Sequence, residues 1–206
     1  MLVDLNITEF LDKMASGQAV PGGGSAAAFC AAMAASLTEM TANLTIGKKG
    51  YEAVDGDMRV IAGRAFELRK KMIRNIDRDP EAFNQVMSAF RMPKDNIEDI
   101  SHKDKAVQEG LRQSTIIPLE VANGALEIME IALDVITQGN RNAVTDGAAG
   151  AMLARTACIA ALSNVRINLK SIRDTTFVTE ISDKVKELEE IVNHLERNYI
   201  VNFTEQ

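Results

Sequence analysis

Hydrophobic residues recur along this chain at spacings of three and four, the period of an α-helix, and no stretch keeps the strict alternation of a half-buried strand. A first short helix is predicted over residues 8–15. A much longer one is predicted from Ser25, a favourable N-cap, to about Ile46, just before Gly47. Alanines lie on almost every side of this segment, and a helix that is apolar all round is buried on several sides. It is therefore expected at the centre of the structure.

The next part of the chain carries a proline that predicts a helix start. Helical spacing covers residues 52–76, and the pair Asp79-Pro80 follows. Asp is a favoured N-cap and Pro a favoured first helical residue, so this pair predicts a separate helix over residues 80–90.

A second proline lies inside a longer helical pattern. The pattern predicts a helix over residues 102–137, with Pro118 in its interior. Because proline removes a backbone hydrogen bond and clashes with the preceding turn, a kink or a break is expected near Thr115. A second helix rich in small residues is predicted over residues 142–162, continuing to about Ile172.

The last predicted helix starts near Thr179 and has an apolar seam of the coiled-coil kind. The seam consists of Ile181, Val185, Leu188, Val192, Leu195 and Tyr199. One stripe of a bundle explains it better than a free-standing zipper does. Together the segments predict an all-α, multi-helix up-and-down bundle, one domain over residues 1–206, with long Ala-rich helices at its centre. The apolar surface exceeds what a thin bundle hides, which favours a homodimer.

Charge and cysteine content narrow the functional class. The net charge is −6, and no basic stripe of the kind that nucleic-acid binders carry is present, so no nucleic-acid partner is expected. The two cysteines, Cys30 and Cys158, lie in apolar runs and are interpreted as small buried hydrophobes. With only His102 and His194 besides, no metal site is expected.

The sequence also predicts a cytoplasmic protein without a membrane partner. Residues 1–10 already contain acidic side chains and lack the pattern of a signal peptide. The longest weakly polar run, residues 25–37, is about 13 residues long, whereas a membrane span needs about 20.

The glycine-rich segment before the long helix is the first candidate for chemistry. Gly22, Gly23 and Gly24 precede Ser25, and free backbone amides at a helix start attract an anion or a polar ring edge. The spacing fits neither a P-loop nor a dinucleotide-binding fingerprint. A plain flexible entry into the helix is the competing interpretation.

Asp79 is the second candidate. Its plain interpretation is a helix cap. A capping carboxyl group that faces a cleft can also transfer protons, because burial raises the pKa of the carboxyl group toward neutral pH.

Asparagines form the third candidate group. Asn140, Asn142 and Asp146 surround one predicted helix start, where capping explains the first two well. Asn164 and Asn168 lie four apart on one face of an apolar helix. Buried amides need partners, which are either neighbouring backbone groups or a ligand rich in donors and acceptors.

These motifs occur in an order that resembles the cyclodeaminase/cyclohydrolase family, which includes the cyclodeaminase half of formiminotransferase-cyclodeaminase and stand-alone relatives. Each motif is weak alone, but five in order are specific, and the resemblance extends from about Ile7 to Tyr199. The motifs are Pro21-Gly22-Gly23-Gly24-Ser25, Asp79 with Ala82-Phe83, Arg91-Met92-Pro93-Lys94, Gly139-Asn140 with Asn142 and Asp146, and Asn164-Val165 with Ile167-Asn168-Leu169.

The resemblance implies an all-α homodimer with a folate-binding cleft near the subunit interface. It implies no metal and no permanently bound cofactor, and a tetrahydrofolate derivative, possibly polyglutamylated, as the substrate. The implied reactions are the closure of 5-formimidoyl-tetrahydrofolate to 5,10-methenyl-tetrahydrofolate with release of ammonia, and the hydrolysis of 5,10-methenyl- to 10-formyl-tetrahydrofolate. The catalytic aspartate of the family falls on Asp79, and Asp77 looks incidental. The glycine-rich segment falls on residues 22–25, and the basic turn of the family on Lys48 and Lys49.

The chemistry of a folate suggests roles for the remaining residues. Lys48, Lys49 or Lys94 are candidates to hold the glutamate carboxylates. Asn164 and Asn168 are candidates to hydrogen-bond the pterin, and the motif of Asn140, Asn142 and Asp146 is assigned to substrate binding. A non-catalytic helical dimer that acts as an assembly module is the alternative function.

Overall fold

The computed structural model describes residues 1–197, and within this range the chain is helical with no β-strand. This confirms the predicted all-α class. Besides three short 3₁₀ turns, η1 (Leu2–Asp4), η2 (Glu52–Val54) and η3 (Arg141–Ala143), six α-helices follow one another. They are α1 (Ile7–Ala15), α2 (Gly23–Asn43), α3 (Asp55–Phe90), α4 (Ile97–Gln138), α5 (Val144–Leu169) and α6 (Thr175–Leu195).

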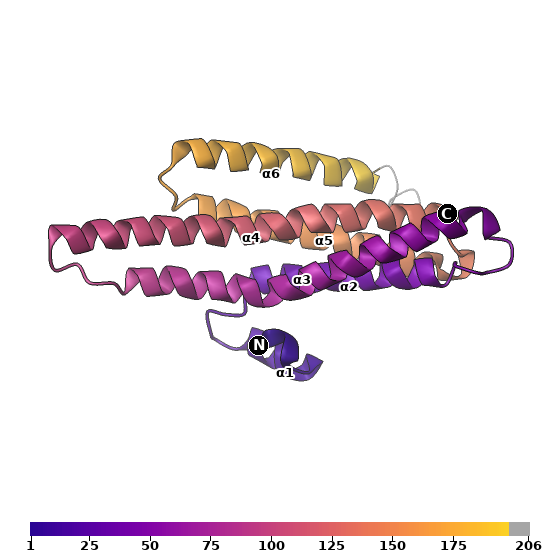
Figure 1. Cartoon of the computed structure of the whole chain (residues 1–206), viewed down its shortest axis with the longest axis horizontal. Helices are drawn as coiled ribbons and strands as arrows, with labels where there is room; N and C mark the ends of the chain where they lie inside the picture. Colours follow the sequence, from indigo (N-terminus) through magenta and orange to yellow (C-terminus); the bar gives the residue numbers. More distant parts are fainter. Residues whose placement is uncertain (198–206) are drawn as a thin grey trace.

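The four long helices α2 to α5 form an elongated bundle in which successive helices run in opposite directions (Figure 1). The α6 helix lies along one side of this bundle, and α1 lies on the opposite side. The hairpin of α3 and α4 extends well past the start of α2, so one end of the molecule is only two helices wide.

The two Ala-rich helices lie in the core, as predicted, and they pack side by side. Ala28 and Ala31 of α2 and Ala154 and Ala157 of α5 are completely buried. Gly150 lets the two backbones approach closely, because a Cβ atom there would lie 3.3 Å from the Ala34 carbonyl oxygen. Small residues at this seam therefore set the spacing of the central pair of helices.

The predicted helix start at Asp79-Pro80 is wrong, because α3 runs without interruption from Asp55 to Phe90. Proline at position 80 deprives the Ile76 carbonyl of its helical donor. The Ser25 hydroxyl, which comes from α2, donates to this carbonyl at 2.9 Å instead. A tertiary contact thus satisfies the carbonyl that a local sequence rule would leave unpaired.

Of the kink or break predicted near Thr115, the break is wrong, since α4 is one continuous helix with Pro118 inside it. Pro118 leaves the Ser114 carbonyl without a helical donor. Asn168 Nδ2 of α5 donates to that carbonyl at 2.7 Å.

Several helix ends also differ from the prediction. The N-cap of α2 is Gly22, and Ser25 is the third helical residue, fully buried. Helix α2 ends at Asn43 rather than Ile46. The α6 helix begins at Thr175, earlier than predicted, because the Asp174 side chain accepts hydrogen bonds from the amides of Thr176 and Phe177.

The apolar seam of α6 packs on the bundle as one of its stripes. Ile181, Val185, Leu188 and Val192 are buried in the main core, and Leu195 packs against it. The last seam position, Tyr199, lies outside the described residues.

One segment, Arg141–Leu169, is long and apolar enough to cross a bilayer by length and composition alone. Half of its most apolar window is buried inside the protein, which is the behaviour of a core helix as well. The sequence predicted a helix rich in small residues here but did not identify it as a possible membrane span.

Candidate functional site

A polar hollow lies where α2 begins and α5 nears its end, against the protruding hairpin of α3 and α4. Its volume is about 340 Å³, within the range of about 300–1,000 Å³ that small-ligand sites occupy. It is lined by Ala19, Val20, Gly22, Gly23, Gly24, Asp79, Phe83, Val86, Met87, Phe90, Leu111, Ser114, Asn164 and Asn168. We call this hollow the Asp79 pocket.

Asp79 caps a helix, but not its own. Its Oδ2 atom accepts a hydrogen bond from the Ser25 amide of α2 at 3.1 Å, and the Ser25 hydroxyl oxygen lies 3.4 Å away. The carboxyl group thus occupies the anion position at the start of α2 that the glycine-rich segment was predicted to offer to a ligand. No hydrogen bond within residues 1–197 reaches the second oxygen, Oδ1, which leaves it available to a substrate.

Gly24 makes this contact possible. A Cβ atom at position 24 would overlap the Asp79 carboxyl group. A Cβ atom at Gly23 would lie 3.3 Å from the Asn164 side chain. The glycines are therefore required for the close approach of α2 to α3 and α5, rather than for a flexible loop.

Burial raises the pKa of Asp79, and hydrogen bonding from Ser25, chiefly from its backbone amide, opposes that rise. The other residues that line the pocket are apolar or neutral, so no second titratable side chain from residues 1–197 shares it. A raised pKa makes a carboxylate a stronger proton acceptor than a free aspartate, and general acid–base catalysis requires a group that accepts a proton and returns it.

Asn164 and Asn168 face the pocket in a fixed orientation. Asn164 Nδ2 donates to the Ala160 carbonyl at 2.9 Å, and Asn168 Nδ2 donates to the Ser114 carbonyl. The partners of both amide nitrogens are thus backbone carbonyls, one of the two possibilities that the sequence left open. Each side chain keeps its oxygen available to accept from a ligand.

The apolar wall of the pocket was missed as a site feature. Phe83, Val86, Met87 and Phe90 all line it, and none of them was among the predicted site residues. They follow Asp79 by 4, 7, 8 and 11 positions and so share its helix face. That periodicity was the available signal. The Asp79-Pro80 pair, interpreted as a helix start, placed Asp79 outside the helix that carries this face.

A second group of predicted site residues lies at the other end of α2, about 30 Å away along a helix of this length. Lys48 Nζ donates to Asn140 Oδ1 at 2.6 Å. Asn140 also receives the Asn142 amide, as the predicted cap, and its own amides donate to Thr45 and Leu44. These bonds join two loops and use every polar atom of the Asn140 side chain.

The remaining predicted residues lie apart from the Asp79 pocket within one chain. Lys49 and Asn142 are exposed, and Asp146 is partly buried near the Asn140 end. Lys94 is exposed beside a neighbouring hollow of about 720 Å³, and Phe90 lines both hollows. Lys94 is thus the predicted lysine nearest to Asp79 along the surface.

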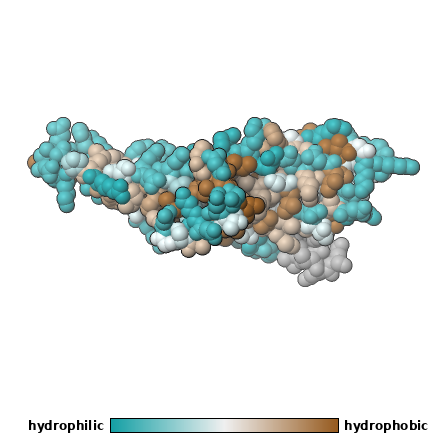
Figure 2. Space-filling model, turned by 90° about the horizontal axis from the view of Figure 1, so that it is seen from below, coloured by the Kyte–Doolittle hydropathy of each residue, from teal (hydrophilic) through white to brown (hydrophobic). Residues whose placement is uncertain are grey.

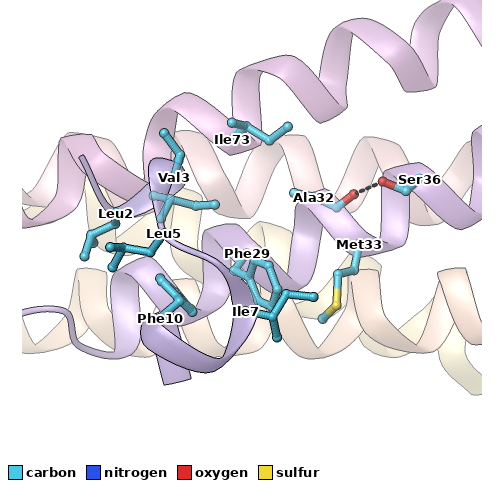
Figure 3. Close-up of a pocket in the computed structure, with 11 residues that line it drawn as sticks. Leu2, Val3, Leu5, Ile7, Phe10, Phe29, Ala32, Met33, Ser36 and Ile73 are labelled. Atoms are coloured by element: carbon cyan, nitrogen blue, oxygen red, sulfur yellow. Dashed lines mark hydrogen bonds between the residues drawn. The ribbon is translucent and has the colours of Figure 1, made fainter. Parts of the chain in front are cut away.

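Another hollow lies between α1 and the bundle, but it carries little chemistry. Phe10 of α1 and Phe29 of α2 both line it and contact each other directly, with ring centroids 5.2 Å apart (Figure 3). Its lining is apolar except for Ser36, whose hydroxyl donates to the Ala32 carbonyl. This hollow shows how α1 is attached rather than where a reaction takes place.

Metal-binding and thiol chemistry find little support in the described part of the chain. Residues 1–197 contain no group of three or more His, Cys, Asp or Glu side chains placed to hold a metal ion. Burial raises the pKa of the Cys158 thiol to about 12 and also raises the pKa of the partly buried Cys30. Neither thiol is poised as a nucleophile.

A helical bundle with one isolated, partly buried carboxyl group in a ligand-sized pocket defines a class, a small-molecule enzyme built for acid–base chemistry. Comparison with known proteins gives the family, since residues 6–187 match the family described as Formiminotransferase-cyclodeaminase. The chain belongs to this family.

Individual relatives agree with that assignment. The chain is 37% identical over 183 residues to methenyltetrahydrofolate cyclohydrolase of Methylorubrum extorquens, which covers 89% of the chain and 86% of the relative. It is 32% identical to formimidoyltransferase-cyclodeaminase of Sus scrofa over 87% of the chain, but it spans only 33% of that longer protein. The crystal structure of formiminotetrahydrofolate cyclodeaminase from Thermotoga maritima superimposes with a TM-score of 0.86 at 29% identity, covering 96% of this chain and 94% of the other.

Proposed function

We propose that this chain is a folate enzyme that opens the methenyl bridge of 5,10-methenyl-tetrahydrofolate to give 10-formyl-tetrahydrofolate. The observation that carries the proposal is the position of Asp79, a carboxyl group with a raised pKa. Among the described residues, it is the sole titratable side chain that lines this ligand-sized pocket. The similarity to a cyclohydrolase of comparable length supports this choice of reaction.

The Asp79 pocket has the groups that a reduced pterin needs. Phe83 and Phe90 offer apolar surface to the flat ring. The free oxygens of Asn164 and Asn168 accept from the amino and amide N–H groups on the ring edge. The amides of Gly23 and Gly24, which have no acceptor within residues 1–197, can donate to a substrate oxygen.

Asp79 then moves the protons of the hydrolysis. Water adds to the electrophilic methenyl carbon while Asp79 Oδ1 takes one of its protons. The same proton passes to N5 as the bond between the carbon and N5 breaks, which leaves a formyl group on N10. The second proton of the water goes to solvent. Fixed placement of substrate and carboxyl group supplies much of the rate.

The cyclodeaminase reaction is the second candidate, and the similarity to the Thermotoga maritima enzyme favours it. Here N10 attacks the formimidoyl carbon, and Asp79 carries a proton from N10 to the departing nitrogen. One further proton from solvent allows ammonia to leave. Both reactions thus require the same carboxyl group to accept one proton and return it.

We propose further that the chain forms a homodimer through α2 and α5. Phe29, Met33, Leu37, Met40 and Leu44 are at least partly exposed and form an uncharged stripe along α2. The exposed or partly exposed apolar residues of α5 include Met152, Ile159 and Ile167. Hydrophobic residues also gather over the middle of the face seen in Figure 2. An uncharged stripe of this length is typical of a buried interface.

A dimer of this kind accounts for the two separated groups of predicted residues. A two-fold axis across the middle of the α2 stripe, near Leu37, makes the two α2 helices antiparallel. Lys48 of the partner subunit then comes level with the start of α2. Antiparallel helix dipoles favour this arrangement. The basic turn of one subunit, together with Lys94 of the other, would hold the carboxylates of a glutamate tail.

The remaining expectations follow from the same proposal. A tetrahydrofolate derivative enters as substrate, and no permanently bound cofactor is required for either reaction. We also propose a cytoplasmic location and no membrane partner. The proposed dimer would cover the exposed side of α5, the helix that is apolar enough to cross a bilayer.

The activity is tested with the purified wild-type chain and two substrates. Loss of the near-ultraviolet band of 5,10-methenyl-tetrahydrofolate reports hydrolysis, and ammonia release from 5-formimidoyl-tetrahydrofolate reports deamination. We expect the first reaction to run well above its rate in buffer. If the chain accelerates neither reaction, the proposed function is wrong.

Folate binding distinguishes the proposed enzyme from the alternative, a non-catalytic assembly module. A ligand that binds only the folded state raises the Tm in proportion to the logarithm of its concentration above Kd. A Tm that rises with added 10-formyl-tetrahydrofolate supports the enzyme. A dimer whose Tm is unaffected by every reduced folate supports the module.

A further inference from the structure

The two prolines inside long helices both lie next to the Asp79 pocket. Pro80 of α3 frees the Ile76 carbonyl, and Pro118 of α4 frees the Ser114 carbonyl. Each carbonyl receives a side-chain donor from the helix packed against it, Ser25 from α2 and Asn168 from α5. Both donor residues contact or line the pocket.

The bond at Ile76 determines what the Ser25 hydroxyl can do. A serine hydroxyl has a single hydrogen atom to donate. Its oxygen lies 2.9 Å from the Ile76 carbonyl oxygen and 3.4 Å from Asp79 Oδ2. Ser25 is completely buried, so water has no access to the carbonyl through this side chain. Donation to Asp79 would leave a buried carbonyl unpaired, which costs more than a weak 3.4 Å contact returns.

We propose that Ser25 is the positioning residue of Asp79, because Pro80 commits its hydroxyl to Ile76 while its backbone amide holds Oδ2 and leaves Oδ1 to the substrate. This inference rests on the proposed function only for the identity of the substrate. The Ser25 side chain, predicted from the sequence to bind substrate, then acts through Asp79 and the α2–α3 contact.

The arrangement also limits how strongly the protein stabilises the charged form of Asp79. The carboxylate receives one short hydrogen bond, from the Ser25 amide, instead of two. The other groups that face it are Phe83 and Val86 of α3, Leu111 and Ser114 of α4, and the two asparagines of α5, none of which is charged. Its charged sequence neighbours are engaged elsewhere, Asp77 with the Leu2 amide and Arg78 with Glu120. The pKa of Asp79 is therefore free to stay raised by burial.

The test is a double-mutant cycle of Ser25→Ala and Pro80→Ala, measured first as Tm without any folate. Ser25→Ala alone leaves the Ile76 carbonyl unpaired, so the Tm falls by about 2–10 °C. In the Pro80→Ala background, the backbone amide that alanine introduces at position 80 donates to that carbonyl. The cost of Ser25→Ala then shrinks to less than half. The cost stays unchanged in the matched Pro118→Ala background, where the Ile76 carbonyl remains free.

The second readout is the pKa of Asp79, obtained by NMR of the labelled carboxyl carbon and from the pH profile of kcat/KM. Pro80→Ala releases the Ser25 hydroxyl to donate to Oδ2, which lowers this pKa by about half a unit or more. The double variant lacks the hydroxyl and shows no such fall. The proposal would be overturned if Ser25→Ala lowered the Tm equally in the wild-type and Pro80→Ala backgrounds. It would also be overturned if the pKa of Asp79 did not change in Pro80→Ala. Since Tm and NMR need no folate, an inactive wild-type chain would refute the proposed function without deciding this one.

Discussion

Asp79 is the residue on which the account of the site depends, and its position has a cost for stability. Burial raises its pKa above the unfolded value, so the folded state binds a proton more tightly than the unfolded state does. As the pH rises from the unfolded pKa through the raised folded pKa, folding loses free energy, and the penalty is complete above the folded pKa. A group that is placed for catalysis thus destabilises the fold that holds it.

Replacing Asp79 by asparagine removes that penalty. We expect Asp79→Asn to have a higher Tm than the wild type at neutral pH, with the difference shrinking as the pH falls through the raised folded pKa. Thermal melts over an acidic to neutral pH series measure this. Asp77→Ala is the control, because Asp77 accepts the Leu2 amide at 2.5 Å and removal of this acceptor should lower the Tm at every pH. An Asp79→Asn variant that is less stable than the wild type at every pH would contradict the burial argument.

Gly24 permits the contact between α2 and Asp79. A methyl group there collides with the carboxyl group, so Gly24→Ala forces Asp79 away from the Ser25 amide. We expect a loss of about 1–3 kcal/mol of unfolding free energy together with a loss of turnover. Chemical denaturation and steady-state kinetics measure the two effects. Gly63→Ala in α3 is the matched control, since a Cβ atom at Gly63 meets nothing within 4 Å. Equal stability of the two variants would show that the close approach is not needed.

At the scale of whole elements, the sequence predicted helix identity well and helix ends less well. Alanine content placed α2 and α5 at the centre correctly, and the seam of α6 is buried where described. The errors arose where a tertiary contact satisfies a backbone group that a local sequence rule leaves unpaired. Asp79 and Pro80 satisfy the rule for a helix start, but a hydroxyl from α2 replaces the missing donor. No property of residues 76–80 contains that information.

The candidate site was predictable to a similar extent. Helical periodicity and motif order identified Asp79, the glycines and the asparagine pair, and the structure brings them into one pocket. The phenylalanine wall was missed although its spacing was visible. The loop around Lys48 and Asn140 lies about 30 Å away because a single chain cannot fold both ends of a 21-residue helix onto one point.

The α6 helix gives a test of an element boundary. Asp174 caps its first turn and also pairs with Arg112 of α4. We expect Asp174→Ala to lower the unfolding free energy by about 1–2 kcal/mol, because it removes the cap and an ion pair that joins two helices. Urea denaturation measures this. Asp183→Ala, which removes an exposed pair with Lys186 on the same helix, should cost much less. Equal losses would mean that α6 does not need its Asp174 cap.

At the scale of the whole molecule, the uncharged stripes of α2 and α5 predict a dimer. A charge placed on such a surface must be buried without a partner when two copies associate. We expect Met33→Glu and Met152→Glu to turn the dimer into a folded monomer. Light scattering after gel filtration and circular dichroism check mass and fold. Ile97→Glu is the control, because Ile97 is 88% exposed on the distant hairpin and should leave the mass unchanged. A wild-type chain that is monomeric at micromolar concentration would remove this proposal and the shared lysines with it.

The central claim is that the Asp79 carboxyl group performs proton transfer on a folate held in its pocket. The most direct measurement compares wild type and Asp79→Asn for both turnover of 5,10-methenyl-tetrahydrofolate and binding of 10-formyl-tetrahydrofolate. Asparagine keeps the shape and the acceptor for the Ser25 amide but accepts no proton. The account predicts that kcat falls by about 10²–10⁴-fold while Kd changes little. Turnover by Asp79→Asn at the wild-type rate, with folate still bound, would contradict it.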